Sequence, residues 1–286
     1  MRKGLGVFFC LMLSFSLLLV GCGGNQGGSS TGETQANKPA EANGVDASKL
    51  KTVQEGKFLF ALSGMAKPYN YTDGDNKLIG FDVDVAMEIS KRLGLEGVAV
   101  QTPWGSILQG LKANKYDAII GGMSITEERQ KQVDFSEPYL LQQAVMFVNE
   151  KNSSGIKSKD DLKGKTVGVV TASTYKDFAL ELVGPEGKVK EYETDLFALQ
   201  ELKNEGRIDV VITDLGVGMD AIQKGKLPAI AIGEPLFVDK CGIPVQKGNQ
   251  ALLDSINKAL NEMKSDGTYL EISKKWFNKD MLSTSN

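Results

Sequence analysis

Residues 108–120 read LQGLKANKYDAII. The first five have the spacing of a helix, and four residues later an aspartate introduces an apolar run typical of a buried strand. The same order returns at residues 199–212, LQELKNEGRIDVVI, with five residues before the aspartate. Because LQxLK is a common helical phrase, coincidence is one explanation. If the repetition is structural, the chain contains two similar α/β lobes, and a ligand would bind in the crevice outside the strand ends.

Short apolar runs alternate with helical periods along the rest of the chain after residue 57, which indicates α/β sheets. Strands are expected at residues 58–62, 118–120, 167–170 and 208–212. Helices are expected at residues 81–93, 107–114, 126–132, 174–183, 195–205, 252–265 and 269–277. Gly94 and Gly206 are expected to end the helices before them, and Ser173 or Thr174 to cap the helix that follows.

Length and composition exclude several classes of function. The chain has 286 residues, which at roughly 100–200 residues per domain leaves room for two lobes. It contains no histidine, so Ser-His and Cys-His triads and His-ligated metal sites are excluded, and we expect no metal or cofactor. With 33 basic and 36 acidic residues, the chain lacks the positive charge that nucleic-acid binding requires.

The N-terminal 21 residues are typical of an export signal. Two basic residues precede an apolar stretch over residues 5–20, about the length of the hydrophobic region of a signal peptide; the alternative is an uncleaved membrane anchor. Residues 19–22, LVGC, resemble a bacterial lipobox, in which the cysteine is acylated. The resemblance implies a signal peptide at 1–21 and a lipoprotein with acyl chains such as palmitate on Cys22. Those chains would anchor it on the extracytoplasmic face of the cell membrane.

The remaining cysteines agree with this interpretation. Cys10 would leave with the signal peptide and Cys22 would carry lipid, so Cys241 has no partner for an internal disulfide. A lone cysteine beside an apolar run is either a packed, inert side chain or a reactive thiol. Residues 22–50 are rich in Gly, Ser, Thr, Asn and Glu with few bulky apolar residues, so we expect the lipidated cysteine to be followed by a flexible tether.

Residues 121–129, GGMSITEER, carry the groups that a carboxylate needs. Glycines such as Gly122 allow the backbone to approach a ligand closely. Thr126 can cap a helix whose first N–H groups face an anion, and Ser124 adds a hydroxyl. Arg129 offers a planar fork that matches a carboxylate. The alternative is that Arg129 pairs with a neighbouring acid on a solvated face.

Asp214 follows the second apolar run and could hold a ligand ammonium group there. It could equally be a helix cap or a turn residue. Carboxylate and ammonium sites in opposite lobes would together define α-amino acids as the ligand class. Trp104, which follows Thr102-Pro103, is a candidate aromatic wall of the cleft or a core residue.

Six motifs give the chain a family resemblance. They are KLIGFDVDV at 77–85, MSITEER at 123–129, VDFSEPY at 133–139, GRIDV at 206–210, and DGTY at 266–269 with KWF at 275–277. In this order and spacing they resemble the family 3 solute-binding proteins, the amino-acid receptors of ABC importers, from about residue 55 to residue 282. Each motif alone would be weak, but the set is specific.

The resemblance implies an α/β fold of the periplasmic-binding-protein type, with two lobes joined by two hinge strands. Lobe 1 would comprise residues 50–138 and 246–286, and lobe 2 residues 139–245. The protein would not be an enzyme. It would bind a polar amino acid between its lobes and deliver it to an ABC transporter permease.

Carried over residue by residue, the family pattern assigns roles to the candidates above. Arg129 and Ser124, with the backbone of Gly122, match the binders of the ligand carboxylate, and Trp104 matches the aromatic wall. Asp214 matches the ammonium binder. The set of ligand-binding candidates is completed by Ser63 and, from the second lobe, by Thr171, Ser173 and Thr174.

The chain departs from the family pattern at three positions. Members with cationic ligands often carry an acid at the position of Ser63 and an aromatic residue at that of Ala66, which puts an arginine, lysine or histidine ligand in doubt. The stretch 63–71 looks more like cystine-binding members, and Ala172 stands where glycine is common.

The sequence is also compatible with two other functions. A few similar proteins are dehydratases of cyclic carboxylic acids, although no carboxylate here has the spacing that marks a general acid. The chain could also be a sensor that reports its ligand to a separate membrane partner.

Overall fold

The computed structural model describes residues 46–151 and 155–283, and no helix within them is long and apolar enough to cross a membrane. The expected signal peptide, Cys22 and the tether as far as residue 45 lie outside the described residues. Two short 3-10 helices, Ala47–Lys49 and Lys159–Leu162, accompany the main elements.

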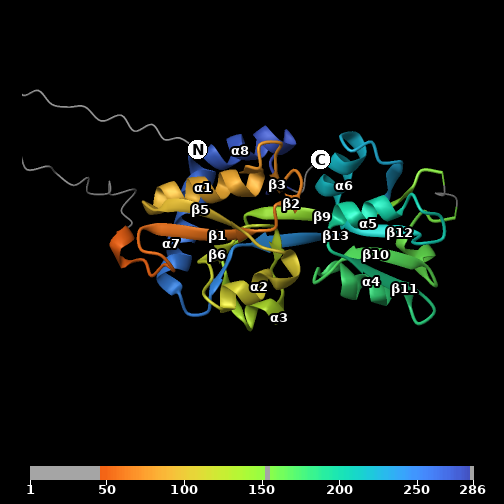
Figure 1. Cartoon of the computed structure of the whole chain (residues 1–286), viewed down its shortest axis with the longest axis horizontal. Coiled ribbons are helices and arrows are strands. Elements are labelled where there is room, and N and C mark those ends of the chain that lie inside the picture. The colour runs from red at the N-terminus through yellow and green to blue at the C-terminus, as the bar shows by residue number, and fades with distance from the viewer. Residues whose placement is uncertain (1–45, 152–154, 284–286) are drawn as a thin grey trace, which may run out of the picture. The chain divides into compact units, whose positions relative to one another are not determined.

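The first sheet has five strands in the order β5-β1-β6-β14-β8 (Figure 1). Strand β1 pairs in parallel with β5 and β6, while β14 runs antiparallel to β6 and β8. The strands are β1 (Lys57–Leu62), β5 (Glu96–Gln101), β6 (Ala118–Ile119), β8 (Val133–Phe135) and β14 (Pro244–Gln246). A small antiparallel sheet of β2 (Met65–Ala66), β3 (Asn70–Thr72) and β4 (Leu78–Ile79) follows β1.

Helices cover both faces of the first sheet. Alternate residues of β1 belong to two different core clusters, as expected for a strand buried on both faces. One cluster includes Val85, Ile89 and Leu93, the apolar face of α1, all fully buried. The helices of this part are α1 (Phe81–Leu93), α2 (Trp104–Lys112), α3 (Glu127–Gln130), α7 (Gln250–Ser265) and α8 (Thr268–Phe277).

The second sheet has six strands in the order β11-β10-β12-β9-β13-β7. Strand β10 pairs in parallel with β11 and β12, and β9 joins β12 and β13 in antiparallel pairs. The strands are β7 (Met123–Ser124), β9 (Leu140–Asn149), β10 (Thr166–Val170), β11 (Lys188–Tyr192), β12 (Val210–Asp214) and β13 (Ala229–Gly242). The helices are α4 (Tyr175–Val183), α5 (Asp195–Glu201) and α6 (Leu215–Gln223). Core clusters lie on both faces of this sheet as well.

Two long strands connect the sheets, and the fold is the expected two-lobe α/β architecture. The chain leaves the first sheet after β8 and enters the second through β9, and it returns from β13 to β14. Strands β9 and β13 lie side by side (Figure 1), paired from Leu140↔Cys241 to Asn149↔Ala229 with a register shift between Ile232 and Phe237. Strand β7 pairs with the end of β13, so Ser124 lies where the two sheets meet.

Most predicted elements exist, but several bounds were wrong. The helix expected at 107–114 begins at Trp104, after Pro103, and the helix expected at 126–132 is shortened to α3. The helix expected at 195–205 ends at Glu201, because the N–H groups of residues 202–204 bond three residues back and tighten the chain into turns. Gly206, with φ of 76°, therefore lies beyond the helix end. The strand expected at 208–212 is Val210–Asp214, which places Asp214 at the end of the strand.

Candidate functional site

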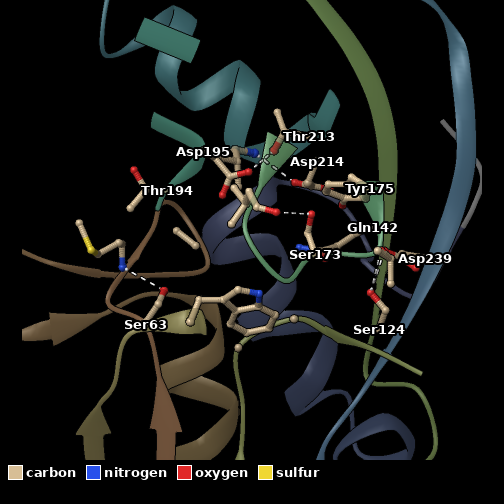
Figure 2. A pocket seen from close by; sticks show the side chains of 18 of the residues that line it. Ser63, Ser124, Gln142, Ser173, Tyr175, Thr194, Asp195, Thr213, Asp214 and Asp239 are labelled. Atoms are coloured by element: carbon tan, nitrogen blue, oxygen red, sulfur yellow. Dashed lines mark hydrogen bonds between the residues drawn. The ribbon is translucent and has the colours of Figure 1, made fainter. Parts of the chain in front are cut away.

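A cavity lies between elements of the two sheets, and eight of the nine predicted ligand-binding residues line it. Figure 2 shows Asp195, Thr213 and Asp214 on one side of this cavity and Ser63 on the other. The eight are Ser63, Trp104, Gly122, Ser124, Arg129, Ser173, Thr174 and Asp214.

Thr171 is the exception among the predicted residues. Its side chain is exposed and it does not line the cavity. Its N–H donates to the carbonyl of Tyr192 at 2.9 Å, which extends the pairing of β10 with β11 beyond the strand end. Val170 and Tyr175, on either side of the 171–174 turn, line the cavity instead.

Arg129 links the two sides of the cavity. Thr126 caps α3 by accepting from the N–H of Arg129 at 3.2 Å, which fixes the start of the helix. The guanidinium donates to the carbonyls of Ser124 and Ala172, each at 3.0 Å. Burial lowers the pKa of the Arg129 side chain, while the nearby carboxylate of Asp239 opposes this shift. Within residues 46–151 and 155–283 Arg129 forms no ion pair, so its charge is not paired with that of a neighbouring acid.

Asp239 is a cavity residue that the sequence analysis missed. It lies on β13, and one carboxylate oxygen accepts from the hydroxyls of Ser124 at 2.8 Å and Thr174 at 3.2 Å. The two hydroxyls are themselves 3.4 Å apart. Burial raises the pKa of Asp239, and the two hydroxyls and Arg129 act in the opposite direction. Thr174 precedes α4 without making the expected side-chain cap, because its hydroxyl is turned toward Asp239.

Asp214 is both a cavity residue and a helix cap. Its Oδ1 accepts from the N–H of Val217 at 3.1 Å, which caps α6, and from the hydroxyl of Tyr69 at 2.8 Å. The side chain is almost fully buried, and burial raises the pKa of Asp214 to about 6. The two alternatives that the sequence left open for this residue are therefore compatible.

A second carboxylate, Asp195, lies beside Asp214 in the cavity and was also missed. It is the first residue of α5, and the hydroxyl of Thr213 donates to its Oδ1. Burial raises the pKa of Asp195, and its charge contributes to the raised pKa of Asp214. The cap at Thr194, whose side chain accepts from the N–H of Phe197, was the available signal, since it places Asp195 where α5 begins.

Ser63, Trp104 and Gly122 complete the wall from the first sheet. The hydroxyl of Ser63 donates to Oδ1 of Asn70 at 3.0 Å. Trp104 starts α2, packs partly against the core cluster beneath it and also lines the cavity, so its position is compatible with both interpretations. Gly122 has φ of 71°, a conformation that favours glycine, and its N–H donates to the hydroxyl of Tyr139 at 2.9 Å.

The arrangement suits a zwitterion better than a metal ion. Among the described cavity residues, Arg129 is the only base, against the acids Glu193, Asp195, Asp214 and Asp239. A ligand could place a carboxylate near Arg129 and an ammonium group near Asp214, from opposite sides. The described part of the chain contains no group of three or more acidic or thiol side chains arranged to hold a metal.

Comparisons with known proteins agree with this chemistry. The sequence profile of bacterial extracellular solute-binding proteins, family 3, matches residues 59–279. The chain is 35% identical to the L-cystine-binding protein TcyJ of Escherichia coli K12 over 83% of this chain and 89% of that protein. It is 32% identical to the L-cystine-binding protein TcyA of Bacillus subtilis 168 over 98% of this chain and 99% of that one.

A solved structure shows the same fold. An ancestral arginine-binding protein bound to glutamine superposes with a TM-score of 0.74 at 40% identity, covering 79% of this chain and 100% of that protein. These three relatives are all named as amino-acid-binding proteins.

Proposed function

Because the chain belongs to the bacterial extracellular solute-binding proteins, family 3, we propose that it is a lipid-anchored receptor that binds one polar α-amino acid in this cavity and presents it to an ABC importer. The observation that carries the proposal is that a basic side chain, Arg129, and an acidic one, Asp214, line the same cavity from different sheets. Arg129 lies on α3, directly before β8 of the first sheet, and Asp214 lies at the end of β12 in the second. Both line one cavity. A free α-amino acid carries the two complementary charges on adjacent groups.

The nine residues predicted from the sequence are proposed as ligand contacts with one change. Thr171 is replaced by Asp195, because the cavity includes the latter and not the former. Arg129 and Ser124 would hold the ligand carboxylate, Asp214 the ammonium group, and Trp104 the apolar part of the ligand.

L-cystine is the first ligand to test. Two relatives that match over most of this chain are named as cystine-binding, and others are named as arginine-binding. Cystine carries two ammonium groups, and the cavity wall includes two neighbouring carboxylates, Asp195 and Asp214.

The lobes are proposed as residues 50–138 with 246–286, and residues 139–245, hinged near the crossings that the long strands β9 and β13 make between the sheets. These crossings are β8 to β9 and β13 to β14. Hinge closure around a ligand is a known motion of periplasmic binding proteins. The permease would then contact the closed receptor through both lobes.

The lipid anchor is proposed from the sequence alone. Residues 19–22, LVGC, follow the apolar stretch of the signal peptide, and cleavage before Cys22 would leave the cysteine free for acylation. Two acyl chains hold a protein stably at a membrane where one is marginal. Mass spectrometry of the mature N-terminus tests this: a diacylated Cys22 supports the anchor, and an intact residue 1 contradicts it.

Thermal unfolding of the full-length chain in detergent tests the ligand class. A ligand at 100 times its Kd stabilises a protein by about 2.7 kcal/mol, which for a chain of this size is roughly 5–10 °C. We expect one polar amino acid in a panel with L-cystine, L-arginine and L-glutamine to produce this shift, and Asp214→Asn to abolish it. A shift with prephenate, a cyclic carboxylic acid, and none with amino acids would contradict the proposal.

A further inference from the structure

A buried carboxylate lies beneath the cavity without touching it. Asp82, in the first turn of α1, is fully buried and forms no ion pair within the described residues. Its two oxygens accept from two buried side chains, Nδ2 of Asn70 at 2.7 Å and the hydroxyl of Tyr139 at 2.8 Å. Burial of an unpaired charge is unfavourable, and it raises the pKa of Asp82 to about 6. Stability therefore does not explain why a carboxylate is present at position 82.

Two chains of hydrogen bonds lead from Asp82 to the cavity wall, one through Asn70 and one through Tyr139. The first of these branches, through Asn70, ends at one part of the wall. Asn70, on β3, presents its Nδ2 to Asp82, so its Oδ1 faces the other way. That oxygen accepts from the hydroxyl of Ser63 at 3.0 Å and from the N–H of Gly64 at 2.8 Å. These bonds hold the turn after β1, and Ser63 lines the cavity.

The second branch ends at another part of the wall. Tyr139 donates its single hydroxyl hydrogen to Asp82, so its oxygen is free to accept. It accepts from the N–H of Gly122 at 2.9 Å. Gly122 lies between β6 and β7, lines the cavity, and belongs to the segment that leads to Ser124 and Arg129.

The direction of every bond follows from the carboxylate. An ionised carboxyl group only accepts hydrogen bonds, whereas an amide both donates and accepts. With Asp82 ionised, both Asn70 and Tyr139 must donate to it, and each must therefore accept from the cavity wall. An asparagine at position 82 would point an N–H₂ group at one of them. That branch would be disrupted and could not simply reverse, because the N–H groups of Gly64 and Gly122 only donate.

We propose that Asp82 is a positioning residue for the ligand site, which fixes the 63–64 and 121–122 segments of the cavity wall through Asn70 and Tyr139. The inference rests on the proposed function for its effect on binding, but its effect on the two segments can be measured without a ligand.

The test compares Asp82→Asn with a matched control, Asp117→Asn. Asp117 is also a buried aspartate, directly before β6, and it accepts from the N–H groups of Val53 at 2.6 Å and Leu59 at 2.7 Å. It does not line the cavity or contact its wall. Both substitutions remove one buried negative charge and add the same amide.

Hydrogen exchange of the ligand-free, full-length chain in detergent is the first readout. In Asp82→Asn we expect the amide of Gly64 or Gly122, whichever lies on the branch that meets the new N–H₂ group, to exchange at least about tenfold faster. In Asp117→Asn we expect both amides to exchange within about twofold of wild type. Unchanged exchange at both amides in a folded Asp82→Asn variant would overturn the proposal. If that variant does not fold, Tyr139→Phe replaces it, with faster exchange expected at Gly122 alone.

Titration with L-cystine and L-arginine is the second readout. For whichever of these wild type binds, we expect Asp82→Asn to raise Kd at least about tenfold and Asp117→Asn to leave it unchanged. Wild-type affinity in Asp82→Asn would overturn the inference while leaving the proposed function intact. If wild type bound neither of these nor L-glutamine, the proposed function would fail, and the exchange experiment alone would decide the role of Asp82.

Discussion

Replacing Arg129 by alanine removes the only basic side chain among the described residues of the cavity wall. A guanidinium has five N–H groups, and the structure accounts for two, donated to the carbonyls of Ser124 and Ala172. Three donors therefore remain for a ligand carboxylate. We expect Arg129→Ala to abolish the binding of an amino acid that wild type binds.

The size of the loss follows from these donors. A hydrogen bond to a charged group contributes about 1.5–3 kcal/mol, so a carboxylate held by two of them loses about 3–6 kcal/mol. Each 1.4 kcal/mol is about tenfold in Kd. The lower end of the range corresponds to a loss of at least about 100-fold.

The fold should survive the change. The substitution also removes the two bonds from Arg129 to backbone carbonyls, one partly buried and one exposed. Because water can replace exposed bonds, their loss costs about 1–3 kcal/mol of the free energy of unfolding, the range for ordinary hydrogen bonds. For a chain of this size that lowers Tm by roughly 2–12 °C. Circular dichroism at 20 °C should therefore be unchanged.

Isothermal titration of both forms is the assay, with Arg207→Ala as control. Arg207 is 66% exposed and pairs at 3.1 Å with Glu201, away from the cavity, so its loss should leave Kd unchanged. A folded Arg129→Ala variant that binds within threefold of wild type would refute the assignment of the carboxylate site.

Three further predictions concern stability. The pKa of Asp82 and of Asp214 is raised from 3.8 to about 6, so between these values the folded chain holds protons that the unfolded chain has lost, and the stabilisation they give is lost as the pH rises from about 4 to 6. In denaturant unfolding, the free energy of unfolding of wild type should fall by about 3 kcal/mol more over this range than that of Asp214→Asn. Parallel curves for the two proteins would contradict this prediction. Tyr69→Phe deprives the buried carboxylate of Asp214 of a donor at 2.8 Å and should lower the free energy of unfolding at pH 7.5 by about 1.5–3 kcal/mol, so equal denaturant midpoints would argue against the bond. Ala172 has φ of 59°, which is unfavourable for a side chain with Cβ, so Ala172→Gly should raise Tm by about 2–4 °C, and a lower Tm would mean that the strain is absent.

Local signals determined what could be predicted from the sequence. Helix α1 was predicted to the residue because two signals coincide, the spacing of Val85, Ile89 and Leu93 and the stop at Gly94, which adopts the left-handed conformation with φ of 70°. The end of α5 was missed because Gly206 looked like a stop, whereas the chain tightens into turns after Glu201.

In the candidate site too, the residues that could be predicted are those with a local signal in the sequence. Ser124 and Arg129 lie within one short motif, and Asp214 follows an apolar run, so each has a recognisable setting in the sequence. Asp239 does not, because it lies on β13, where Gly233, Pro235 and a register shift break the alternation expected of a strand. Asp239 becomes a cavity residue only in the folded chain, where it contacts Ser124 and Thr174, which are 115 and 65 residues away from it in the sequence.

Equilibrium dialysis of the purified full-length chain against labelled L-cystine and L-arginine, with wild type and Arg129→Ala in parallel, tests the central claim most directly. We predict that wild type binds one molecule of one of these amino acids per chain and that the variant retains none at the same concentration. Binding of neither, or equal binding by the folded variant, would contradict the claim that this cavity holds an amino acid through Arg129.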